Sequence, residues 1–167
     1  MAHSYKPGQA FGISAASLVG KSLGASQLKD AEEYAKENRR IGSIIASIMG
    51  LVFFFLGPQL VGLYTRDPII IENASNALKI VAIVQPFQVS QFILAGALRG
   101  AGDTVWPLVA TFFGVLIIRV VIAYVLIGFW GFGLIGAWIG LFIDQIIRWV
   151  FVYGRFRTGK WKHVDIK

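Results

Sequence analysis

The sequence predicts an all-α, polytopic membrane protein that forms a single membrane domain over residues 1–167, with about five transmembrane helices. Hydrophobic residues make up 56% of the chain and charged residues 15%, and the mean hydropathy is +0.65. This composition suits lipid better than water as a solvent. Uncharged segments about one membrane thick recur, and the basic residues lie between and after them, as in proteins that follow the positive-inside rule.

The first predicted span, 4–24, is less hydrophobic than the others but carries a small residue at every fourth position. These residues are Gly8, Gly12, Ala16, Gly20 and Gly24. Such a face allows another helix to approach to backbone contact within a membrane. We therefore expect a helix-packing face on a span that is surrounded by protein.

The other four predicted spans follow from the placement of charges. Residues 41–65 and 80–98 are uncharged and long enough to cross a hydrocarbon core of about 30 Å. The apolar sequence from 105 to 153 is too long for one crossing. The segment 128–133, rich in glycine and aromatic residues, predicts a turn that separates spans 105–127 and 133–153. A basic tail, 154–167, follows.

The distribution of Lys and Arg predicts the orientation. With five spans, Lys6, Arg66 and Lys79 lie on one side of the membrane. The opposite side receives many more basic residues: Lys21, Lys29, Lys36, Arg39, Arg40, Arg99, Arg155, Arg157, Lys160, Lys162 and Lys167. The positive-inside rule then predicts a cytoplasmic C-terminus in the cell membrane.

Three glutamines in the span 80–98 are candidates for lining a substrate cavity. Gln85, Gln88 and Gln91 are three residues apart and lie on neighbouring directions of one helical face. Gln91 would lie roughly 16 Å deep, where an amide needs a hydrogen-bonding partner or a water-filled cavity. Bonds to neighbouring helices are the structural alternative. Pro86 predicts a kink, either mobile or static.

Ionisable groups inside predicted spans are a second set of candidates. Arg119 is a further cavity candidate, roughly 9 Å from the outer surface, whereas Asp144 lies roughly 20 Å from it, so we do not expect a direct pair. Asp144 and Arg148 are four residues apart in the order that favours a helical ion pair. They could form a structural salt bridge, or Asp144 could take part in ion coupling.

The stretch "GALRGAGDT" predicts a turn between two spans. Gly100 and Gly102 allow unusual backbone angles, Asp103 is expected to cap the helix that begins near Thr104, and Arg99 suits the end of the preceding helix. The stretch contains G-x-G but lacks the preceding strand and the remaining residues of a phosphate-binding fingerprint.

Other functional classes find little support. The chain has no cysteine and its only two histidines, His3 and His163, lie in the terminal segments. A disulfide framework is therefore excluded, and we expect no metal site, no cofactor and no enzymatic activity. The net charge of +7 is explained by basic residues around the spans, so we expect membrane lipid rather than nucleic acid as a partner.

Two motifs resemble the multidrug and toxic compound extrusion (MATE) family. They are "AFGISAASLVGKSLGASQLKDA" and, some seventy residues later, "GALRGAGDT", in which Gly96, Arg99, Gly100, Gly102, Asp103 and Thr104 carry the likeness. "RVVIAYVL" and "YGRFRTGKW" add to it. The resemblance implies a bundle of about twelve helices in two pseudosymmetric lobes around a central cavity. This chain is similar to the second lobe from its second helix to the C-terminus.

The resemblance also implies a function and a missing part. Family members exchange organic, often cationic compounds for H+ or Na+ by alternating access. The first lobe and the first helix of the second are absent, so we expect them upstream or in a separately encoded half, and we expect no transport by this piece alone. In one branch an acidic residue occupies the position of Gln88. This chain is similar to the branch that couples ions through the first lobe.

Two alternatives remain at this stage. One is a flippase for lipid-linked oligosaccharides of the same superfamily, although these proteins line their cavities with more charges. The other is a non-transporting membrane fragment or subunit that packs against a partner through the face from Gly8 to Gly24.

Overall fold

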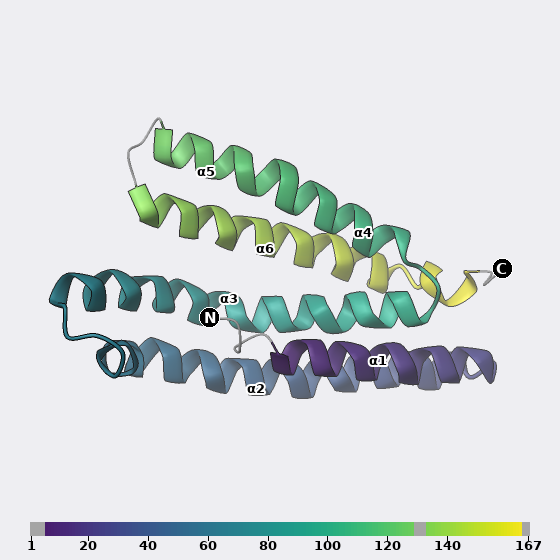
Figure 1. Cartoon of the computed structure of the whole chain (residues 1–167). Helices are drawn as coiled ribbons and strands as arrows, with labels where there is room; N and C mark the ends of the chain where they lie inside the picture. Colours follow the sequence, from purple (N-terminus) through teal and green to yellow (C-terminus); the bar gives the residue numbers. More distant parts are fainter. Residues whose placement is uncertain (1–5, 129–132, 165–167) are drawn as a thin grey trace.

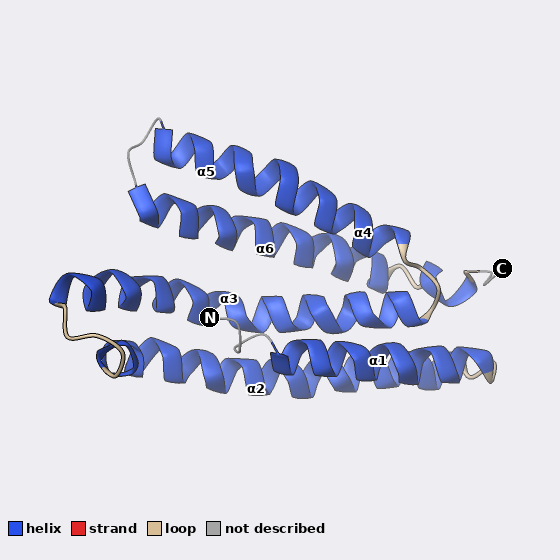
Figure 2. Ribbon diagram, in the orientation of Figure 1, coloured by secondary structure: helices blue, strands red, loops and turns tan. Residues whose placement is uncertain are grey.

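The computed structural model describes residues 6–128 and 133–164, and these residues form helices joined by short turns (Figures 1 and 2). The elements are α1 (Lys6–Gly24), α2 (Leu28–Gly62), α3 (Pro68–Gly100), α4 (Val105–Phe112), the π-helical segment η1 (Phe113–Ile118), α5 (Arg119–Gly128), α6 (Gly133–Arg157) and the 3-10 turn η2 (Lys160–His163). No strand occurs in these two ranges. The predicted all-α class is confirmed.

Four helical segments are long and apolar enough to cross a membrane. They are Leu28–Gly62, Pro68–Gly100, Val105–Gly128, which combines α4, η1 and α5, and Gly136–Arg157. The fifth predicted span forms α1, a helix of 19 residues, but is not among these four, so its crossing stays a prediction. The aromatic residues of the predicted turn at 128–133 lie outside the described residues.

The helices form two groups that meet at α3 (Figure 1). One layer contains α1, α2 and α3, while α6 lies over α3 and carries the α4–η1–α5 rod on its outer side. The chain runs back and forth, so that α1, α3 and α6 end where α2 and α4 begin. This common end, at the right of Figure 1, carries most of the basic residues and is called the basic end below.

α2 is longer than the span predicted for it. The span 41–65 was predicted from charge alone, whereas α2 already begins at Leu28 and continues for 35 residues. Ala31 and Ala35 are fully buried one turn apart, and Lys36 forms an ion pair with Glu32 on the preceding turn at 2.5 Å. Packing and charge pairing therefore extend the helix beyond the apolar segment.

α1 and α3 meet at the distance of backbone contact. A Cβ atom added to Gly12 would lie 2.9 Å from the carbonyl oxygen of Phe92, and one at Gly96 would overlap the carbonyl oxygen of Gly12. One turn further on, a Cβ at Gly100 would overlap the carbonyl oxygen of Ala16. Backbone meets backbone from Gly12 to Gly20, whereas Gly8 lies against the side chains of Val89 and Phe92. The small residues of α1 therefore face α3 from Gly8 to Gly20.

Two details of that prediction are corrected. A Cβ at Gly24 would meet nothing within 4 Å, because α1 ends there, so Gly24 does not belong to the contact. The face is also occupied by α3 of the same chain. It is therefore not free to bind a separate partner, as the subunit hypothesis required.

The "GALRGAGDT" turn is built differently from the prediction. Gly102 has a φ of 82°, as a turn glycine allows, but Gly100 is still helical and serves the contact with α1. The predicted Asp103 cap is wrong, because the Asp103 carboxylate lies 2.7 Å from Nε of Arg155 on α6. Asp103 is buried, and a buried carboxylate is stabilised by pairing with a cation such as the Arg155 guanidinium. The helix α4 begins without a side-chain cap.

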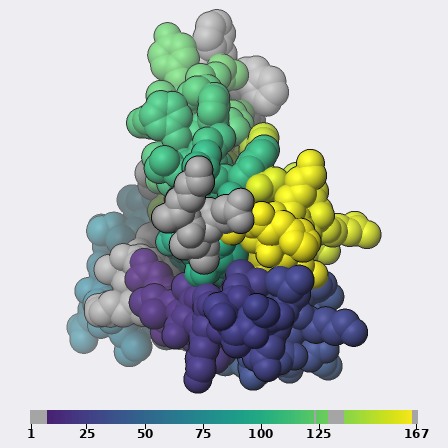
Figure 3. Space-filling view, turned by 90° about the vertical axis from the view of Figure 1, so that its right-hand side faces the viewer, coloured from purple at the N-terminus to yellow at the C-terminus, as the bar shows by residue number. Residues whose placement is uncertain are grey.

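The C-terminal segment folds back onto the start of α2. Trp161 in η2 is fully buried, stacks on Phe156 and donates from its indole nitrogen to the Phe156 carbonyl at 2.8 Å. Lys162 forms an ion pair with Glu32, and Figure 3 shows this segment, in yellow, against the dark blue part of the chain.

The backbone contact between α1 and α3 predicts that two glycine substitutions differ in their effect on stability. Gly96→Ala should destabilise the fold by about 1–3 kcal/mol, because its methyl group forces α1 away from α3. Gly154→Ala is the matched control: a Cβ there meets nothing within 4 Å, so higher helix propensity should leave stability unchanged or raise it. Thermal unfolding in detergent, followed by circular dichroism, measures both. Equal behaviour of the two variants would contradict the contact.

Candidate functional site

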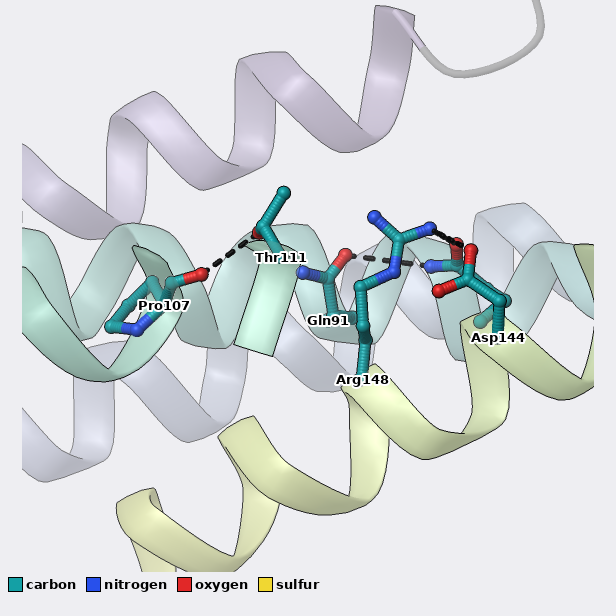
Figure 4. Close-up of polar contacts among 6 residues, drawn as sticks. Gln91, Pro107, Thr111, Asp144 and Arg148 are labelled. Atoms are coloured by element: carbon teal, nitrogen blue, oxygen red, sulfur yellow. Dashed lines mark hydrogen bonds and ion pairs between the residues drawn. The ribbon is translucent and has the colours of Figure 1, made fainter. Parts of the chain in front are cut away.

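Four polar side chains from two helices meet in the middle of the bundle and form what we call the polar cluster: Gln91 of α3 and Asp144, Gln145 and Arg148 of α6 (Figure 4). Gln145 Nε2 donates to Gln91 Oε1 at 3.4 Å, and the Arg148 guanidinium donates to Gln145 Oε1 at 2.8 Å. The same guanidinium nitrogen lies 2.7 Å from Asp144 Oδ2. The helical ion pair predicted for Asp144 and Arg148 is therefore present.

The cluster is buried among apolar helices. Asp144 has no exposed surface, Gln145 is 2% exposed and Gln91 3% exposed. Within the described part of the chain, Asp144 Oδ1 and Arg148 Nε have no hydrogen-bond partner. A buried charge is stabilised only by such pairing, so each member of the cluster depends strongly on the others.

The π-helical segment η1 supplies the surface on which the ion pair rests. A Cβ added to Gly114 would lie 2.5 Å from both Asp144 Oδ1 and Arg148 Cγ. Glycine is therefore required here for α6 to bring its charged residues against the backbone of η1. Thr111, one turn earlier, donates to the carbonyl of Pro107 in its own helix at 2.8 Å and remains outside the cluster (Figure 4). π-Helical turns are frequent at functional sites.

An aromatic row next to the cluster fixes α6 on α3. Trp149 donates from its indole nitrogen to Ser90 Oγ at 3.0 Å and packs edge-on against Phe87. Its other face stacks on Tyr153, with ring centroids 5.1 Å apart. These contacts continue the α3–α6 interface toward the basic end and hold the register that places Gln145 opposite Gln91.

The structure separates the cavity candidates predicted from the sequence. Gln91 belongs to the polar cluster, Gln85 is buried, and Gln88 is partly exposed. Arg119 is exposed at the start of α5, and no salt bridge links it to Asp144 among the described residues. Of the three glutamines, Gln85 and Gln91 are thus buried between helices, and only Gln88 is partly exposed.

Sequence reasoning missed one member of the polar cluster, Gln145, and the glycine against which the cluster packs, Gly114. Gln145 directly follows Asp144, and an amide so close to an intramembrane charge was the available signal. Gly114 gave no such signal, because one glycine in an apolar segment does not reveal which residue approaches it. The π-helical geometry of η1 likewise has no recognisable sequence pattern.

The arrangement suits electrostatic positioning. Across residues 6–128 and 133–164, no group of three or more His, Asp or Glu side chains lies close enough to hold a metal ion. The cluster offers one buried carboxylate, one guanidinium and two amides. Such a set can orient polar groups or hold charge within a membrane.

Four helical segments are long and apolar enough to cross a membrane, and the helices enclose a buried cluster of polar and charged side chains, a combination typical of multi-pass helical membrane proteins. Comparison with known proteins gives the family. The MatE family model matches residues 3–125, and the chain belongs to this family.

Individual relatives agree with this assignment. The chain is 32% identical over 155 residues to a probable multidrug resistance protein NorM of Thermotoga maritima, covering 92% of this chain and 33% of that protein. It is 29% identical over 144 residues to an uncharacterized transporter, YisQ, of Bacillus subtilis, covering 86% of this chain and 32% of the relative. The chain thus spans about a third of the length of these relatives.

A solved structure shares the fold. The inward-facing conformation of a multidrug resistance MATE family transporter of the MOP superfamily superimposes with a TM-score of 0.80 at 20% sequence identity. The match covers 97% of this chain and 40% of that one. The helices described above are therefore arranged as in part of a MATE transporter.

The buried ion pair predicts strong coupling between its two members. Arg148→Met should destabilise the protein by about 3–5 kcal/mol, because it leaves the Asp144 carboxylate buried without a cation. The double variant Asp144→Asn with Arg148→Met should recover most of this loss, since no net charge remains buried. Unfolding of the wild type, of Arg148→Met, of Asp144→Asn alone and of the double variant in detergent completes the cycle. Additive losses would show that the two side chains are not coupled.

Proposed function

We propose that this chain forms part of one lobe of an antiporter that exports organic compounds by alternating access in exchange for H+ or Na+. The proposal is supported by membership of the MatE family and by relatives named multidrug resistance proteins. Because the chain spans about a third of those relatives, transport would require the missing first lobe or a separately made half. Small organic, often cationic compounds are the expected substrates.

The observation that carries this proposal is the polar cluster between α3 and α6. A purely structural helix pair in lipid would need no buried carboxylate and guanidinium, and both are costly there. In a rocking-lobe mechanism, the ion pair and its support on Gly114 would hold α4–η1–α5 to α6 as the lobe moves. Partly exposed Gln88, on the same α3, is the glutamine best able to meet a solute.

The coupling ion is expected to bind mainly outside this chain. Arg148 already occupies Oδ2 of Asp144 and places a positive charge where Na+ would have to bind. The position at which one branch of the family carries an acidic residue is Gln88 here. Both features favour a coupling site in the first lobe.

The proposed orientation places the C-terminal segment in the cytoplasm. The basic end collects the ends of α1, α3 and α6 and the starts of α2 and α4, as the alternation of spans predicts. Arg99, Arg155 and Arg157 lie there together with the C-terminal segment. By the positive-inside rule this end faces the cytoplasm.

Export should depend on Gln88. In a chimera where this chain replaces the matching part of the Thermotoga maritima relative, Gln88→Ala should lower ethidium export two- to tenfold, since one neutral hydrogen bond contributes roughly 0.5–1.5 kcal/mol. Gln59→Ala, which changes an exposed glutamine on α2, is the matched control. Fluorescence of loaded cells at equal expression measures export. Unchanged export by the Gln88 variant would remove this residue from the solute path.

The orientation is tested by cysteines placed in this cysteine-free chain. Thr104→Cys, at the exposed start of α4, should resist an impermeant maleimide added to intact cells and react only after permeabilisation. Tyr64→Cys, at the opposite end of the bundle and 92% exposed, should react at once. The reverse pattern would invert the proposed topology. Position 104 is preferred to Gly102, whose positive φ would strain a cysteine.

A further inference from the structure

An open groove lies between α2, α3 and α6 on the side of the bundle near the basic end. It has a volume of about 660 Å³ and is lined by Lys36, Arg39 and Arg40 at one end and by Ile44, Phe87 and Trp149 at the other. We call it the interfacial groove. The polar cluster does not contribute to its lining.

The groove changes from charged to apolar along a single helix. Arg40 is the last charged residue of α2 before the uncharged segment 41–65, and Ile44 follows one turn later, roughly 6 Å deeper in a membrane. Ile44 is 52% exposed. In a membrane, the end of the groove at Ile44 would therefore lie at the depth of acyl chains, and the end at Arg39 and Arg40 would lie at the depth of phosphate groups.

The Arg39–Arg40 end of the groove carries positive charge that no salt bridge among the described residues cancels. Lys36 is paired with Glu32, and Arg39 lies over the ring of Tyr153 at 5.2 Å, a contact that orients it without neutralising it. Arg40 is exposed, and Glu37 is the acidic residue among the groove's lining. A second hollow of about 240 Å³ shares Lys36 and Arg39 and adds Arg157, together with the Glu32–Lys162 ion pair.

The apolar end is shaped by fixed aromatic rings. The indole nitrogen of Trp149 donates a hydrogen bond to Ser90 Oγ, so Trp149 presents ring surface to the groove rather than a hydrogen-bond donor. Phe87 is held edge-on against Trp149, with centroids 5.4 Å apart. A ligand here must combine an anionic head with an apolar tail, which excludes a free anion or a hydrophilic peptide as the best fit.

We propose that the interfacial groove binds an anionic phospholipid, with its phosphate between Arg39 and Arg40 and one acyl chain along Ile44, Phe87 and Trp149. Basic pockets between transmembrane helices bind anionic headgroups in this way. The site lies apart from the polar cluster. It concerns lipid recognition by this chain and does not rest on the proposed export function.

The test compares two lipids and two pairs of substitutions. The full 167-residue chain is purified in a nonionic detergent, mixed with equal amounts of phosphatidylglycerol and phosphatidylcholine of the same acyl chains, and analysed by native mass spectrometry. We expect phosphatidylglycerol to be retained about tenfold more. Arg39→Gln with Arg40→Gln should abolish this preference. Lys21→Gln with Lys29→Gln removes the same charge from exposed positions near the same end and should preserve it.

Three results would overturn the proposal. They are equal retention of both lipids by the wild type, equal loss of preference in both double variants, and loss of bound phosphatidylglycerol when millimolar inorganic phosphate is added. The last result would indicate a site for a free anion. Arg40→Gln alone alters an exposed side chain and should give an intermediate preference, so a folding defect in the double variant does not decide the outcome. This experiment measures lipid binding and not transport, so its outcome is independent of whether the proposed export function is correct.

Discussion

The direct backbone contact between α1 and α3 determines where the other helices can lie. The carbonyl oxygens of Gly12 and Ala16 occupy the space where side chains of residues 96 and 100 would be. In lipid, where hydrophobic association is weak, close packing of this kind is a main source of helix affinity. It anchors α3, which in turn also contacts α2, α4 and α6. The family motif around residue 100 is therefore first a packing motif and only second a turn.

The position of α3 makes the polar cluster possible. Gln91 lies five residues before Gly96, so the helix that α1 holds in place also presents this amide to Gln145 on α6. The Asp144–Arg148 ion pair also occupies the space that a side chain at position 114 would fill, and Gly114 leaves this space open. Glycines in two different helices thus bring one buried charge pair and its amide partner together, and the apolar environment makes their pairing obligatory.

The basic end follows a different physical rule from the interior. There, charges are paired across elements by short contacts that are partly or largely buried, as between Asp103 and Arg155 or between Glu32 and Lys162. These pairs connect α6 and the C-terminal segment to the turn and to α2. Arg39 and Arg40 keep their charge beyond this network, next to exposed apolar surface. The basic end therefore combines ion pairs that hold its elements together with a surface suited to a membrane boundary.

The sequence by itself determined the helical class and the existence of long apolar segments, and its spacings put small residues on one face of α1 and Asp144 four residues before Arg148, because each depends on local composition or on a spacing within one helix. It did not determine where the helices begin, since α2 starts at Leu28 and α3 at Pro68, well before the predicted spans 41–65 and 80–98. The predicted helix cap at Asp103 was wrong, because Asp103 pairs with Arg155. The sequence also did not reveal Gln145 or Gly114 as members of the site. Those roles join residues from different helices. Only the packing of α3, η1 and α6 decided them, because contacts between helices depend on relative rotation and depth, which no spacing within one helix records.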